Sequence, residues 1–190
     1  GNTVTFTAWV KFDQFSDNMK PFSQRDESTD NTAYEMSYVN SDNVFECQFK
    51  SDSGNFVDIE ISPPSTDEWV HYACKYDGSQ GVIYENGQRI KSKNVPNIRT
   101  PDDGAIGSLA DGTGSFMDGQ VDEVLVYNRS LSDSEIEDLY FHGSPFKGNY
   151  TAEKIDNDED TEWNVLEVNA SVPSNTSVNA TFRALDTDGG

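Results

Sequence analysis

Short runs that alternate apolar and polar side chains constrain the fold of this chain most. Val4, Phe6, Ala8 and Val10 stand at every second position, and successive side chains of a β-strand point to opposite faces with this period. Further runs rich in Val, Ile, Phe and Tyr, bounded by Ser, Asp, Asn, Gly and Pro, occupy residues 33–39, 44–50, 56–61, 70–76 and 121–127. The pattern predicts an antiparallel β-protein.

One tight turn joins two of the expected strands. Asn86 and Gly87 both tolerate a positive φ, and they divide the run at residues 82–90 into two strand-like halves. An Asn-Gly pair between such halves is typical of a two-residue type I′ turn. The sequence therefore predicts a β-hairpin here.

One helix is expected, near residues 132–143. Ser132 and Glu135 have the spacing of a capping box, in which each residue bonds the backbone N–H of the other. Leu131 and Ile136 stand at the hydrophobic staple positions, and Gly143 is suited to end the helix. Many strands and a single short helix indicate an all-β sandwich.

The stretch from Glu68 to Tyr140 carries an ordered series of short motifs, preceded by FTAWVKF at residues 6–12. These motifs are Trp69 with His71, Tyr76-Asp77-Gly78, Ile106-Gly107, Gly119-x-Val121-Asp122-Glu123, and the run from Asn128 to Ile136. In this order they resemble a laminin-G-like module of the concanavalin A-like superfamily. The resemblance implies an antiparallel two-sheet jelly roll with one short C-terminal helix over residues 1–147, without the strand-forming segment that usually comes first.

The composition changes after residue 147. Residues 148–190 are rich in Asn, Asp, Ser and Thr and contain strand-like runs at 151–155, 162–170 and 177–185. They resemble the opening strands of small β-sandwich domains that often follow laminin-G-like modules. Three strands make a poor independent core, so we expect a partial second β domain in a piece of a larger multidomain or oligomeric protein.

The chain is strongly acidic. It has 34 acidic and 13 basic residues, which gives a net charge of −21 at pH 7. Like charges repel one another within a compact fold. This repulsion is best tolerated in concentrated salt, where ions screen it over a short distance. We therefore expect a salt-adapted organism, with an ordinary acidic extracellular protein as the alternative. Nucleic acid and anionic membranes are excluded as partners by like-charge repulsion.

Two features bear on the compartment. Glycosylation sequons occur at Asn149, Asn169, Asn175 and Asn179, which predicts an exported, surface-exposed glycoprotein, although an Asn-, Ser- and Thr-rich chain also forms sequons by chance. Cys47 and Cys74 lie in separate strands, each on the apolar face. They form a disulfide in an oxidising compartment or remain buried thiols, and the sequence leaves both options open.

Catalysis is not expected. Glucanases related to this fold need two carboxylates about 5 Å apart on one face, and the nearest approach here is Asp58 and Glu60. The third carboxylate of the glucanase pattern is absent, because position 56 is Phe. The two histidines, His71 and His142, suggest no zinc triad. We interpret the acidic pair as surface charge.

Calcium is the one cofactor that we expect. Laminin-G-like and pentraxin-like sandwiches often hold Ca²⁺ at a loop rim, and this hard cation takes six to eight oxygen ligands. The candidate ligands are Asp102, Asp103, Asp111 and Asp118. The alternative is that these are simply surface acids of a salt-adapted protein.

The sequence thus predicts a non-catalytic extracellular module that binds a glycan or a surface protein. The resemblance implies ligand contacts at the loops of residues 16–31, 77–80 and 111–115 or on the concave sheet. Its candidate ligand residues are Trp9, Tyr34, Tyr38, Asp77 and Asp111; the alternative for the three aromatic residues is a place in the core. Two alternatives stay open: a structural decoration or fibre of a cell envelope or virion, and a glycoside hydrolase.

Overall fold

The computed structural model describes residues 3–26, 31–101, 103–110 and 112–143. All of them lie within one compact unit, residues 1–148. The expected second β segment at 148–190 and the sequons at Asn149, Asn169, Asn175 and Asn179 lie outside the described residues.

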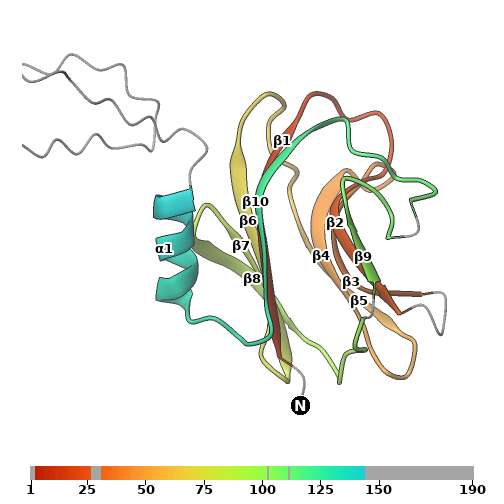
Figure 1. The fold of residues 1–190 in the computed structure, drawn as a ribbon, viewed down its shortest axis with the longest axis vertical. Coiled ribbons are helices and arrows are strands. Elements are labelled where there is room, and N and C mark those ends of the chain that lie inside the picture. The colour runs from red at the N-terminus through yellow and green to blue at the C-terminus, as the bar shows by residue number, and fades with distance from the viewer. Residues whose placement is uncertain (1–2, 27–30, 102, 111, 144–190) are drawn as a thin grey trace, which may run out of the picture. The chain divides into compact units, whose positions relative to one another are not determined.

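Two five-stranded antiparallel sheets face each other (Figure 1). Sheet A has the order β10 (Gly119–Tyr127), β1 (Val4–Phe12), β6 (Val70–Tyr76), β7 (Gln80–Glu85) and β8 (Gln88–Asn94). Sheet B has the order β5 (Phe56–Ile61), β4 (Val44–Lys50), β3 (Asn31–Val39), β2 (Met19–Asp26) and β9 (Asp103–Ile106). The predicted two-sheet jelly-roll sandwich is confirmed.

Aromatic side chains fill the space between the sheets. Phe6 of β1 and Phe45 and Phe49 of β4 are fully buried, and the ring centroid of Phe45 lies 3.8 Å from that of Tyr72 on β6. Each ring removes about 150–250 Å² from water and so dominates the energetics of a core. The alternation in the sequence therefore corresponds to one face of each strand packing inward.

A disulfide joins the two sheets through this core. Cys47 of β4 bonds Cys74 of β6, with their Cα atoms 5.7 Å apart. Both side chains are fully buried. Of the two options that the sequence leaves open, the structure has the disulfide.

The helix α1 (Asp133–Gly143) lies against the outer face of sheet A (Figure 1). The predicted capping box is present: the backbone N of Glu135 donates to Ser132 Oγ at 3.2 Å, and the backbone N of Ser132 donates to Glu135 Oε2 at 2.8 Å. Leu131 and Ile136 are buried against a small cluster of sheet A side chains, namely Ala73, Val82 and Tyr84. The helix thereby shields the part of the outer face of sheet A over β6 and β7 from solvent.

The hairpin between β7 and β8 also agrees with its prediction, since Asn86 and Gly87 have φ values of 50° and 78°. The segment at residues 16–31 does not, because it contains β2 where we expected a loop. Pro21 and two register shifts interrupt the alternation of β2. Pairing with β3 on one side and β9 on the other holds this irregular strand in the sheet.

The disulfide predicts a loss of stability on reduction. The bond closes a loop across 27 positions, and cross-linking a loop of this length restricts the unfolded chain by about 3–4 kcal/mol. We expect the reductant to lower the melting temperature of the full chain. A Cys47→Ala/Cys74→Ala variant should melt at the same temperature with and without reductant. Thiols that react with an alkylating agent in the unreduced, unfolded chain would contradict the bond.

Candidate functional site

Sheet B presents a row of hydrogen-bonding side chains on the face turned away from the core. We call this the polar face; it consists of Lys20, Glu35, Ser37, Glu46, Gln48, Asp58 and Glu60. The members on β3, β4 and β5 alternate with core residues such as Met36, Cys47 and Ile59. Within the described part of the chain, the helix lies on the opposite side of the sandwich (Figure 1). The polar face is therefore left without a covering helix.

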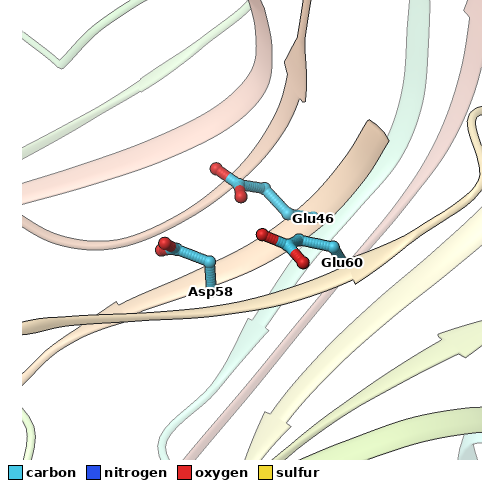
Figure 2. Close-up of side chains that lie close together, drawn as sticks. All are labelled: Glu46, Asp58 and Glu60. Carbon is cyan, nitrogen blue, oxygen red and sulfur yellow. The ribbon is translucent and has the colours of Figure 1, made fainter. Parts of the chain in front are cut away.

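Three carboxylates converge in the polar face. The strand register sets Glu46 of β4 opposite Glu60 of β5 and Gln48 opposite Asp58. One oxygen each from Glu46, Asp58 and Glu60 lies within 4.8 Å of the other two. Figure 2 shows the three side chains rising from the two neighbouring strands. Strand pairing has thus added a third carboxylate to the predicted pair.

Neighbouring polar groups hold parts of this cluster. Ser37 Oγ donates to Glu46 Oε1 at 2.9 Å, and Gln48 Nε2 donates to Asp58 Oδ1 at 2.9 Å. Lys20 forms an ion pair with Glu35, whose side chain is almost completely buried. The second oxygen of Glu35, Oε2, is buried without a hydrogen-bond partner. The face therefore combines satisfied and unsatisfied acceptor groups.

The electrostatics of the cluster favour a protonated Glu46. Burial raises its pKa to about 7; the hydrogen bond from Ser37 lowers it, the charges of Asp58 and Glu35 raise it further, and Lys20 opposes them. A carboxyl group with such a pKa exchanges its proton near neutral pH. It can donate a hydrogen bond in one state and accept one in the other.

The same oxygens suit a hard cation, which prefers carboxylate ligands. Among the described residues, Glu46, Asp58 and Glu60 form the one group of three or more acidic, His or Cys side chains close enough to share a metal ion. Of the loop acids predicted from the sequence, the structure describes two: Asp103 accepts from the backbone N of Gly104 at 2.7 Å, and Asp118 pairs with Gln14. Asp102 and Asp111 lie outside the described residues. Calcium binding stays a prediction.

Of the two options for the aromatic residues, sugar stacking and core packing, the structure has core packing. Trp9, Tyr34 and Tyr38 are 3%, 5% and 2% exposed. Tyr38 packs on Phe15, with ring centroids 4.3 Å apart, and Tyr34 stacks on Phe6 at 5.0 Å. Because neighbouring rings occupy their faces, these side chains give no open stacking platform.

Two of the predicted ligand residues have other surroundings. Tyr34 lines a cavity of about 630 Å³ at one end of the sandwich, together with side chains that include Ile98, Arg99 and Val126. Asp77 caps its own turn, because its Oδ1 accepts from the backbone N atoms of Ser79 and Gln80 at 2.9 and 2.8 Å. The turn therefore already uses the Asp77 carboxylate.

An aromatic side chain that sequence reasoning did not propose stands open on sheet B. Phe56 is 47% exposed, and it pairs with Lys50 in the register of β4 and β5. The Nζ atom of Lys50 lies 4.4 Å from the centroid of the Phe56 ring, a cation–π contact. The signal was present in the sequence, since residue 56 shares the strand period of Asp58 and Glu60.

The raised pKa of Glu46 predicts a specific pH dependence of stability. Its folded pKa, about 7, lies above the unfolded value near 4.3. The folded state is therefore favoured most below about pH 4, and this contribution is lost as the pH rises toward 7. Because Gln does not ionise, we expect Glu46→Gln to raise the free energy of unfolding near pH 7 by on the order of 1–2 kcal/mol, a figure already discounted for solvent screening.

The measurement is the free energy of unfolding of both proteins at several pH values between about 4 and 8, at constant ionic strength. Glu123→Gln serves as the matched control, because Glu123 is exposed on β10. Parallel curves for the wild type and Glu46→Gln would contradict the prediction.

No helix in the described residues is long and apolar enough to cross a membrane. Comparison with curated proteins gives no match. Solved structures with a similar fold include the botulinum neurotoxin serotype G binding domain (TM-score 0.62, 14% identity, 76% of this chain and 37% of that chain). They also include a putative carbohydrate binding protein from Bacteroides ovatus (TM-score 0.57, 18% identity, 71% of this chain and 40% of that chain).

A third similar structure is domain 4 of AbnA, an extracellular arabinanase from Geobacillus stearothermophilus, in complex with arabinotriose (TM-score 0.54, 21% identity, 73% of this chain and 66% of that chain). The chain thus spans well under half of the first two structures. At these identities the likeness shows the fold alone. A laminin G family model, described as the concanavalin A-like lectin/glucanases superfamily, matches residues 1–137. The chain therefore belongs to this laminin G family.

Proposed function

We propose that this chain is a non-catalytic module that binds a glycan on the polar face of sheet B, in an extracellular protein of a salt-adapted organism. The observation that carries the proposal is a sheet face without a covering helix, on which converging carboxylates, an amide and an exposed aromatic ring lie together. The net charge of −21 supports the salt-adapted setting.

Sugar chemistry fits this set of groups. Sugar hydroxyls donate to carboxylates such as Asp58 and Glu60 and accept from amide groups such as that of Gln48. The apolar face of a pyranose or furanose ring packs on an aromatic side chain, a role that the exposed ring of Phe56 suits. The similar structures support the class of ligand, since one is described as a putative carbohydrate binding protein and another holds arabinotriose.

Hydrolysis is the second candidate, and Glu46 is the observation that favours it. Retaining glycosidases need a carboxylic acid of raised pKa and a second carboxyl group about 5 Å away. Glu46 has the raised pKa, and oxygens of Asp58 and Glu60 lie within 4.8 Å of it. We favour binding because the three groups lie on two neighbouring strands of one sheet, with Glu46 buried and Asp58 and Glu60 half-buried. The two cavities described for this sandwich are lined by other residues.

The alternative ligand of the polar face is a protein on a cell envelope or virion. The polar face would then contact basic or amide-rich side chains, since its charge is negative. The glycan is preferred because an exposed ring flanked by hydrogen-bonding groups matches a sugar ring and its hydroxyls.

The binding test is a glycan array in high salt, followed by titration of the best ligand. We expect Phe56→Ala and Gln48→Ala each to weaken binding about tenfold, equivalent to about 1.4 kcal/mol. Ile90→Ala is the matched control, because Ile90 is also 47% exposed but lies on β8 of sheet A. Tyr34→Phe should also leave binding unchanged; a loss there and not at Phe56 would move the site to the cavity beside Tyr34 and contradict the proposal.

A hydrolysis test separates the second candidate from the first. We expect no release of reducing sugar from the glycan that binds, and Glu46→Gln should retain binding within about threefold, as for the loss of one neutral hydrogen bond. Sugar release that Glu46→Gln abolishes, while the glycan still binds, would make the protein a hydrolase.

The net charge of −21 also predicts that salt stabilises the fold. Raising NaCl from about 0.1 M to about 2 M shortens the Debye length from about 10 Å to below 3 Å and so screens the repulsion between carboxylates. The melting temperature should rise over this range. Sucrose at matched osmolality is the control for effects other than screening, and a melting temperature that falls with salt would count against a salt-adapted origin.

A further inference from the structure

A second cavity lies between the outer face of sheet A and the C-terminal part of α1. It has a volume of about 170 Å³. Its lining includes Thr7, Trp9, His71 and Glu123 from the sheet and Leu139 and His142 from the helix. The cavity lies on the opposite sheet from the polar face, so it is independent of the proposed glycan site.

Three polar atoms in this lining are buried without a hydrogen-bond partner: Thr7 Oγ1, Trp9 Nε1 and His71 Nδ1. The residues are 1%, 3% and 2% exposed. Thr7 and Trp9 stand two positions apart on β1, and His71 is opposite Trp9 on β6. Nearly all buried polar groups in folded proteins bond to protein or ordered water, so three unsatisfied atoms around one cavity indicate an occupant.

The packing of α1 explains why the helix leaves this space. Its first turns are anchored by Leu131 and Ile136 in the cluster on β6 and β7. Toward its end, Tyr140 stacks on Trp9, with ring centroids 5.5 Å apart. Gly143 follows so closely that a Cβ there would lie 3.2 Å from Trp9 Nε1. The last turn of the helix therefore packs against Trp9, and glycine at position 143 has no side chain that could accept a hydrogen bond from the indole N–H of Trp9.

The three atoms specify the chemistry of the occupant. Trp9 Nε1–H only donates, while the Thr7 hydroxyl donates and accepts. Burial lowers the pKa of His71 to about 4, so its ring is neutral near pH 7 and carries one N–H and one lone pair. The occupant must therefore accept from Trp9 and also exchange hydrogen bonds with a hydroxyl and an imidazole, which a hydroxyl group does.

Charged occupants fit less well. An anion would meet the carboxylate of Glu123 in the lining and the net charge of the chain, −21. A metal ion would need several close ligands, and among the described residues His71, His142 and Glu123 do not form a metal-sharing group. Neutral hydroxyl chemistry remains.

We propose that this cavity binds neutral hydroxyl groups: ordered water in dilute buffer, and a small polyol such as glycerol when one is present. The volume supports both occupants, because 170 Å³ is far above the roughly 10–15 Å³ that one water needs. Water and polyol present the same donor and acceptor groups to Thr7, Trp9 and His71.

The test is an NMR measurement on the full chain labelled with ¹⁵N in its three tryptophans. The Trp9→Phe variant identifies the indole signal of Trp9. We expect a cross-peak between the Trp9 indole proton and long-lived water. Glycerol should weaken this cross-peak and shift the Trp9 signal in a saturable way, while the signal of Trp69, which lies just before β6, stays in place.

A conservative variant tests the assigned partner. Thr7→Val keeps the shape of the side chain and removes the hydroxyl, so the apparent affinity for glycerol should fall roughly 2- to 10-fold, as for one neutral hydrogen bond. Thr66→Val is the control, because Thr66 is exposed between β5 and β6; its glycerol affinity should equal that of the wild type.

The outcomes separate the two occupants. A long-lived water signal without a glycerol shift would overturn the polyol half of the proposal and retain the water site. If the folded chain shows neither, or if the Trp9 indole proton contacts side-chain protons from another part of the chain, the proposal is wrong, because protein then fills the cavity.

Discussion

Burial of aromatic rings between two sheets is the interaction on which the rest of this structure depends. Phe6, Phe45, Phe49 and Tyr72 interlock in the core, and the Cys47–Cys74 bond crosses the same layer. Because one face of every central strand is committed to this core, the remaining faces must meet helix or solvent. The helix covers sheet A with Leu131 and Ile136, which leaves sheet B to present its polar side chains.

The carboxylates of sheet B follow from that division. Glu46 is buried on this face. Desolvation therefore outweighs the hydrogen bond from Ser37, and the pKa of Glu46 rises to about 7. Asp58 and Glu60 lie beside it on the next strand. On a chain with a net charge of −21, most acids are simply solvated. This cluster differs because strand pairing holds three carboxylates within one small area, where the charge of Asp58 adds to the effect of burial and raises the pKa of Glu46.

Helix packing on sheet A has the opposite character. The N-terminal end of α1 is well satisfied: Asp133 Oδ1 accepts from the Tyr84 hydroxyl at 2.6 Å and from Lys75 Nζ at 2.9 Å. Its C-terminal end closes over Thr7, Trp9 and His71 and leaves their polar atoms without protein partners. The helix is thus held by hydrogen bonds at its N-terminal end and borders a cavity at its C-terminal end.

The sequence by itself determined the strands, the Asn86-Gly87 turn and the capping box at Ser132 and Glu135, because each depends on neighbours a few positions apart. It missed β2, whose alternation is interrupted at Pro21 and which pairs with the distant β9 as well as with β3. It left Trp9, Tyr34 and Tyr38 between a ligand surface and the core, and all three rings are buried. Only the tertiary structure decided that Glu46 joins Asp58 and Glu60 and that Phe56 is exposed on sheet B. The physical reason is that strand register and sheet coverage are set by contacts between separate segments, which the alternation within one strand does not record.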